Sequence, residues 1–183
     1  MRAQAIVLPL IGAIGLLVFA SGCMARQRSW DGDVRQSPDG RVCFSIENDS
    51  VLDSDVVRVA AIIVSELDER ERVSRTTWTA DFTRSNPPAM LSAGTCIPYA
   101  THDSVRTVGQ VIPVEPGRRY SVFINADIKN GADWDNRGYG AFFCISEDSM
   151  QRRVIHEVHW NEATERRHWD VCGLDSSAGS ISD

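Results

Sequence analysis

The segment from Val108 to Ile128 reads VGQVIPVEPGRRYSVFINADI and carries the clearest indication of the fold. Two runs rich in branched apolar residues, 108–114 and 118–128, lie on either side of Pro116-Gly117. Branched apolar side chains favour extended strands, and a Pro-Gly pair favours a turn between them. The segment therefore predicts two strands that meet at a corner.

The corner carries a more specific pattern. From Val114 to Val122 the sequence follows apolar-x-Pro-Gly-x-x-Tyr-x-Val, with the tyrosine at Tyr120. This pattern resembles the corner between strands E and F of fibronectin type III modules, where the tyrosine hydroxyl bonds back to the chain upstream. An ordinary Pro-Gly hairpin is the alternative interpretation.

Most of the chain on both sides of this segment reads as short strands separated by turns. Further strands are predicted at 41–47, 56–64, 73–82, 139–145 and 153–160. Many short strands at regular spacing, without a long helical pattern, are typical of an all-β fold. We therefore expect a single β-sandwich, like an immunoglobulin or fibronectin type III module, over residues 35–174.

The N-terminus, MRAQAIVLPLIGAIGLLVFASGC, is organised like a secretory signal. A positive start at Arg2, an uncharged and mostly apolar stretch from Ala5 to Ala20, and small residues before Cys23 follow one another. Ala20-Ser21-Gly22-Cys23 resembles the bacterial lipobox, whose cysteine carries the lipid. An ordinary signal peptide with a chance cysteine is the alternative.

This signal predicts how the chain is divided and where it is located. We expect residues 1–22 to be the signal peptide, 23–34 to be the lipidated cysteine and a flexible tether, and 175–183 to be a disordered tail. Met24 follows the cysteine, where an aspartate would signal retention in the inner membrane. The outer membrane, facing the periplasm, is therefore the expected location.

Four cysteines remain after Cys23. An even number in an oxidising compartment indicates two disulfides, with three possible connectivities. We prefer Cys43–Cys96 and Cys144–Cys172, and four buried free thiols are the alternative. No C-x-x-C pair is present, which argues against redox catalysis and a zinc knuckle.

The mature chain is acidic, with 18 basic and 25 acidic residues and a charge of −7 once Arg2 leaves with the signal. This charge argues against nucleic acid as a partner and permits a basic protein. The sequence carries no catalytic motif, and His156 and His159, three apart in a predicted strand, point to opposite faces. The sequence therefore predicts no enzyme, no metal and no cofactor.

Residues 130–138, rich in Asn, Asp and Gly, are predicted to form a loop that contains Trp134. Aromatic and arginine side chains are enriched at protein interfaces, so this loop is the candidate partner-binding site. The candidate residues are Trp134, Asp133, Asp135, Arg137 and Tyr139. A loop held by one buried indole is the alternative, whereas Trp78 and Trp160, in predicted strands, are expected in the core.

Several of these features occur together in one family, the type VI secretion immunity periplasmic lipoproteins, which the chain resembles over roughly residues 1–146. The matching residues, besides the signal, are Val42-Cys43-Phe44-Ser45-Ile46, Cys96-Ile97-Pro98-Tyr99, Gly117, Tyr120, Val122, Ile124 and Tyr139 through Cys144. The resemblance implies a protein that binds and neutralises a toxic effector delivered into the periplasm. An envelope structural or assembly lipoprotein, or an enzyme with a nonstandard site, remain alternatives.

Overall fold

A computed structural model of the 183-residue chain describes residues 29–46, 57–85, 87–92, 94–101, 106–130 and 132–174. The predicted signal peptide at 1–22, the predicted lipid attachment site Cys23 and the predicted tail at 175–183 lie outside these ranges. No helix within the described ranges is long and apolar enough to cross a membrane.

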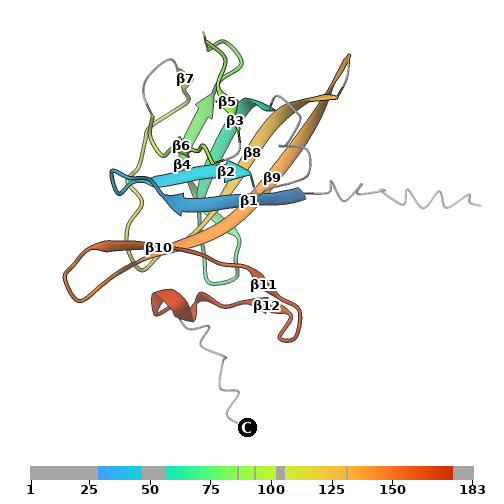
Figure 1. The fold of residues 1–183 in the computed structure, drawn as a ribbon. Helices are drawn as coiled ribbons and strands as arrows, with labels where there is room; N and C mark the ends of the chain where they lie inside the picture. The colour runs from blue at the N-terminus through green and yellow to red at the C-terminus, as the bar shows by residue number, and fades with distance from the viewer. Residues whose placement is uncertain are drawn as a thin grey trace, which may run out of the picture.

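Four long antiparallel strands form the centre of the fold, in the spatial order β9, β8, β3, β4 (Figure 1). They are β3 (Val57–Leu67), β4 (Val73–Asp81), β8 (Arg119–Asn130) and β9 (Asp133–Glu147). The strands predicted at 56–64, 73–82 and 118–128 correspond to β3, β4 and β8, except that Phe82 follows the end of β4 and Val56 lies outside the described residues. Figure 1 shows the hairpin of β8 and β9 projecting beyond the rest of the sheet.

The sheet is extended by strand β1 (Ser29–Gln36), which changes partners along its length. Its first residues, Ser29–Asp31, pair in parallel with β9, and Gly32–Gln36 then pair antiparallel with β2 (Val42–Ile46). A Cβ atom at Gly32 would lie 3.3 Å from the carbonyl carbon of Gly140, so a glycine allows the close approach at the point of exchange.

Shorter elements complete the domain. Strand β10 (Arg153–Glu157) pairs with the last part of β9. It lies on the same edge of β9 that pairs with β1 earlier in that strand. The remaining elements are β5 (Met90–Leu91) on β3, β6 (Ile97–Pro98) on β2, β7 (Arg106–Thr107) on β4, a separate hairpin of β11 (Trp160–Asn161) and β12 (Arg166–Arg167), and the 3-10 helix η1 (Trp169–Cys172).

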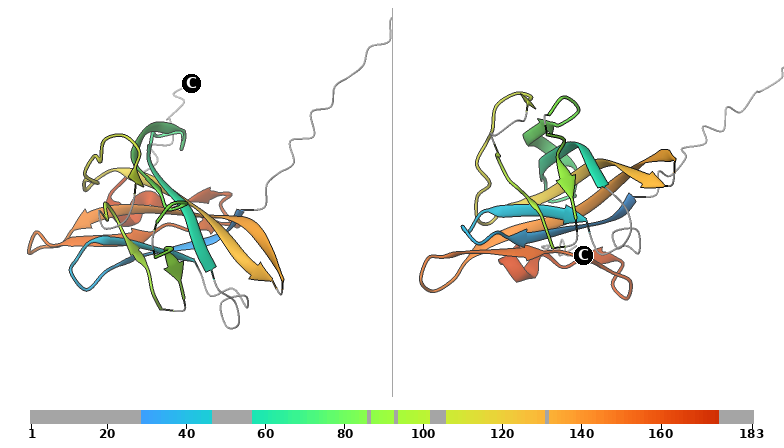
Figure 2. Two further views of the ribbon diagram at one scale, coloured as in Figure 1. Left: turned by 90° about the horizontal axis from the view of Figure 1, so that it is seen from above. Right: turned by 45° about the horizontal axis from the view of Figure 1, so that its top comes forward.

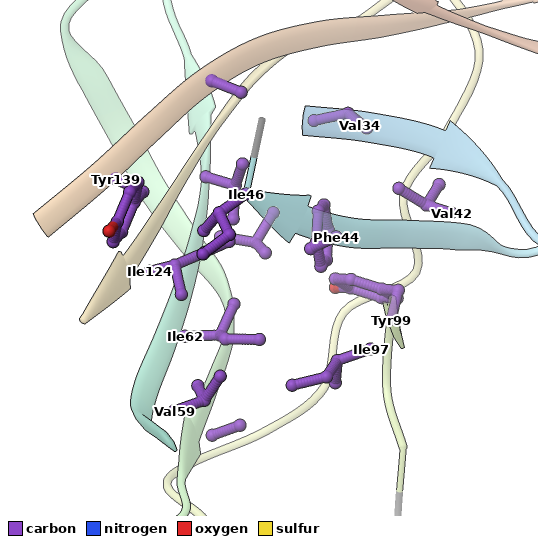
Figure 3. Packing of buried hydrophobic residues seen from close by; sticks show 14 of the residues in the cluster. Val34, Val42, Phe44, Ile46, Val59, Ile62, Ile97, Tyr99, Ile124 and Tyr139 are labelled. Carbon is purple, nitrogen blue, oxygen red and sulfur yellow. The ribbon is translucent and has the colours of Figure 1, made fainter. Parts of the chain in front are cut away.

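The core lies inside the curl of the sheet, where β2 comes to face β4 (Figure 2). Phe44 of β2 stacks on Trp78 of β4 with ring centroids 6.2 Å apart, and Tyr99 meets the same indole edge-on at 5.2 Å. Figure 3 shows the apolar side chains of β2, β3 and β8 pointing into this interior. Strands that are far apart in the sheet order therefore bury their apolar faces against each other.

The predicted tyrosine corner is confirmed. The hydroxyl of Tyr120, which is fully buried, accepts a hydrogen bond of 2.8 Å from the backbone N–H of Glu115, five residues upstream. The strand predicted at 108–114 is wrong, although the amides of Val108 and Ile112 donate to carbonyls of β4. Gly109, with a φ of +87°, and Pro113, which has no N–H, interrupt the ladder there.

The all-β prediction is confirmed, but the strands are arranged differently from the expected immunoglobulin-like sandwich. Ten strands of the described ranges join in one continuous mixed sheet, curled into a half-barrel. The cause is β1, whose hydrogen bonds to both β9 and β2 connect what would otherwise be two sheets. The expectation of a flexible tether at 23–34 is wrong for residues 29–34, because these backbone pairings fix a segment whose side chains are mainly polar.

The predicted disulfides are confirmed in pairing. Cys43 of β2 is bonded to Cys96, and Cys144 of β9 is bonded to Cys172 of η1. Two disulfides indicate an oxidising, extracytoplasmic location.

Candidate interaction surface

The predicted recognition loop is instead the end of a β-hairpin. Strand β9 begins at Asp133, and residues 133–138 pair in register with residues 125–130 of β8. Asn, Asp and Gly have low strand propensity, so the local sequence favoured a loop. Backbone pairing with β8 overrides that preference.

Because a strand points successive side chains to opposite faces, the five candidate residues are divided between the two faces of β9. Trp134 lies on the outer face, away from the core. Asp133, Asp135, Arg137 and Tyr139 alternate with it on the opposite face. Asp135 forms an ion pair with Arg137 at 2.9 Å. Tyr139 is fully buried in the core and cannot contact a partner, so its prediction as a contact residue is wrong.

Trp134 sits at one end of a polar network that crosses three strands. The Arg58 guanidinium of β3 lies 4.5 Å from the centre of the Trp134 ring, and Arg58 also pairs with Asp127 of β8 at 3.0 Å. The Asn136 amide of β9 donates to Asp127 at 2.9 Å and to Asn125 at 2.8 Å. The Asn136 hydrogen bond, and after it Arg58, hold the pKa of Asp127 below its ordinary value. The network holds these polar side chains in place around the indole.

Apolar side chains surround this network on the same face. Ile63 is directly opposite Phe123, and Met90 is directly opposite Arg58, and cross-strand partners share a face. The Phe123 ring lies over Gly138, where a Cβ atom would be 2.6 Å from its Cζ. We define the outer-face patch as the exposed apolar residues Ile63, Met90, Phe123 and Trp134 together with Arg58, Asp127 and Asn136.

Ile63, Met90 and Phe123 were not among the contact residues predicted from the sequence. A signal was present for the first, because the run VVRVAAIIV has more apolar residues than one buried face can take. Met90 carried no signal, because β5 is two residues long and its face depends on pairing with β3.

The opposite end of the outer face is covered by the C-terminal segment 158–174. Trp169 and Val158 pack there against Leu67 and Cys144 in a second, small core. Glu71, at the turn between β3 and β4, accepts hydrogen bonds from the Trp169 indole at 2.9 Å and from Arg167 at 2.7 Å. The patch is thus the part of this face that the C-terminal segment leaves open. Trp160, expected in the core, is 48% exposed on β11.

Within the described part of the chain, His156 and His159 do not converge on a site. Ser146 Oγ and His156 Nε2 are 2.8 Å apart, but Glu157, the next residue, turns to accept the Val34 amide at 3.2 Å and does not orient the imidazole. His159 is largely exposed. Among the residues that the structure describes, no three His, Cys, Asp or Glu side chains come together as metal ligands do.

No family model, no curated protein and no solved structure matches this chain.

Proposed function

We propose that this protein is a lipid-anchored envelope protein that binds and neutralises a toxic effector of a type VI secretion system. The observation that carries the proposal is the outer-face patch, in which exposed apolar side chains surround an ordered polar network. The N-terminal sequence and its resemblance to immunity lipoproteins support the same function.

The composition of the patch suits a protein partner. Trp, Phe, Met and Arg are the residue types enriched at protein interfaces, and Trp and Arg are the most frequent hot spots. Ile63, Phe123 and Trp134 lie on long strands with many backbone hydrogen bonds. Such a surface loses little conformational freedom on binding, which favours high affinity.

The net charge of the protein indicates a second property of the expected partner, its own charge. The mature chain carries a charge of −7, and the side-chain charges within the patch, Arg58 and Asp127, neutralise each other. The protein as a whole therefore attracts a basic partner at long range, while the contact itself is mainly apolar. An effector with a positive net charge and an apolar docking site fits both.

The expected location of the protein supports the same function. The signal peptide exports the chain, and the lipid on Cys23 anchors it in the outer membrane, facing the periplasm. The domain starts at Ser29, so five residues separate it from the anchor. At about 3.5 Å per residue they keep the domain within about 20 Å of the bilayer. The protein then meets an effector that is delivered into the periplasm.

A competition on solid medium tests the function. A strain that lacks the gene is mixed with its parent, whose type VI apparatus is either working or disabled. We expect the deletion strain to die only beside the armed parent, the one whose apparatus works. Returning the wild-type gene to the deletion strain should restore its survival. Survival of the deletion strain beside a parent whose type VI apparatus is shown to be active would contradict the proposal. A stable envelope partner in cells without the effector would then favour a structural or assembly role.

A further inference from the structure

The half-barrel contains a cavity at the end where β1 turns into β2. It measures about 260 Å³, and its walls come from β2, β9, β10 and the segments around residues 99–100 and 111–114. The apolar lining consists mainly of Val42, Tyr99, Val111, Val114, Ile145 and Ile155. Small-molecule sites are apolar concavities of this kind, and barrel mouths are one of their usual places.

The cavity follows from the way in which the sheet curls. Strand β1 leaves β9 after Asp31, and β10 pairs with β9 over Phe143–Glu147, so no backbone ladder joins β1 to β10. Side chains bridge the two strands, since Gln36 Nε2 donates to the Arg153 carbonyl and Glu157 accepts the Val34 amide, each at 3.2 Å. Two apolar residues of the lining, Val111 and Ile155, are only partly buried.

The wall of the cavity includes a strained residue. Ala100 has a φ of +58°, in the left-handed region that residues other than glycine seldom adopt. Such conformations persist where the surrounding structure enforces them, and they are concentrated at binding sites. The adjacent Tyr99 holds the segment in place, because its hydroxyl donates to the Ile112 carbonyl at 2.6 Å.

Two arginines, Arg41 and Arg153, contribute to the lining of this otherwise apolar cavity. Arg41 is engaged by Asp39, with Nε 2.6 Å from the carboxylate. Arg153 is an exposed residue at the start of β10, where its carbonyl is held by Gln36. Glu147, the cross-strand partner of Arg153, is exposed and is not part of the lining. Among the described residues that line the cavity, both charged side chains are therefore arginines.

We propose that the cavity binds an aliphatic carboxylate, with a medium-length acyl chain among the apolar side chains and the carboxylate on Arg153. Burial of the chain removes apolar surface from water, and a carboxylate on a guanidinium forms the stronger, charge-assisted kind of hydrogen bond. The site lies inside the curl, whereas the outer-face patch lies outside it. The inference is therefore independent of effector binding.

The test compares decanoate with decanol, which has the same chain without the charge, by isothermal titration calorimetry. It uses the whole mature chain, exported with Cys23→Ser so that no acyl chain is attached. We expect saturable binding of decanoate below its micelle concentration, and weaker binding of decanol. Arg153→Gln should weaken decanoate about tenfold and leave decanol unchanged. Arg152→Gln is the matched control, because Arg152 pairs with Asp148 in the adjacent turn, and should bind as wild type does.

A second variant tests the apolar part. Ile155→Trp fills the cavity and should abolish binding of both ligands. The Arg153→Gln comparison decides the question even where Ile155→Trp does not fold, because residue 153 is exposed and its replacement leaves the core intact. Absence of saturable decanoate binding would overturn the inference. Equal decanoate affinity in wild type and Arg153→Gln would also overturn it.

Discussion

Removing the Cys144–Cys172 disulfide, in the double variant Cys144→Ala/Cys172→Ala, should release the C-terminal segment before the rest of the sheet opens. The two cysteines are 28 residues apart. The chain-entropy relation gives such a loop about 3.6 kcal/mol of global stability. For opening of the C-terminal segment alone, with β10 still paired to β9, the closed loop is the 15 residues 158–172, worth about 3 kcal/mol.

Hydrogen exchange measured by mass spectrometry separates these two effects. A loss of about 3 kcal/mol corresponds to about a 100-fold fall in the protection of backbone amides in the segment. The hydrogen bonds that Trp169 and Arg167 donate to Glu71 remain, so the segment should exchange faster without becoming fully unfolded.

The matched control is Cys43→Ala/Cys96→Ala, which opens a loop of 53 residues within the main core. It should lower the thermal midpoint without a preferential loss of protection in the C-terminal segment. Wild-type protection of the C-terminal segment in the Cys144→Ala/Cys172→Ala variant would contradict this prediction. Packing and Glu71 would then suffice to hold the segment.

Three further changes have defined outcomes. Tyr120→Phe removes the acceptor for the Glu115 amide, so urea unfolding should show a loss of about 1 kcal/mol, and an unchanged midpoint would mean that water replaces the hydroxyl. Because the pKa of Asp127 is lowered in the folded state, its carboxylate stabilises the fold above about pH 4. This stabilisation is lost as acid protonates the carboxylate. The difference in thermal midpoint between wild type and Asp127→Asn should therefore shrink as the pH falls below about 4, and a constant difference would contradict this. Glu71→Gly removes the carboxylate but relieves a φ of +57°, so it should destabilise less than Glu71→Ala in thermal melts, and the reverse order would show that the left-handed backbone carries no strain.

Much of the fold could be predicted because its signals are local. The run at 56–64 and the tyrosine corner at 114–122 each specify their structure within about ten residues. The preferred pairing of Cys43 with Cys96 and of Cys144 with Cys172 was also correct. A strand flanked by turn residues can be predicted without knowing which strands pair with it.

The errors arose where structure depends on distant partners. Residues 29–34 and 133–138 are polar and rich in Gly and Asp, yet both are strands because other strands pair with them. The continuous sheet depends on one exchange of partners at Gly32, which no local pattern records. Long-range pairing decides such segments, and local propensity does not.

The candidate site, too, could be predicted only in part from local sequence. Aromatic and charged residues correctly drew attention to Trp134, but only the strand register reveals that Tyr139 is buried and that Phe123 and Ile63 share the exposed face. A loop would have presented the predicted residues together. The strand instead alternates them, so the surface that forms has a different membership.

The proposed binding surface is tested most directly by complementing the deletion strain with Trp134→Ala or Trp160→Ala and measuring survival beside an armed parent. The two indoles are similarly exposed, at 45% and 48%, and each lies near an arginine, but Trp160 is outside the outer-face patch. Loss of an exposed cation–π contact costs about 0.5–1 kcal/mol, so both variants should melt within about 4 °C of wild type. Loss of an interface anchor costs about 2 kcal/mol or more in affinity, about 30-fold. At equal protein levels, we expect Trp134→Ala to lose protection and Trp160→Ala to keep it. Full protection by Trp134→Ala would contradict the assignment of the patch as the effector-binding surface.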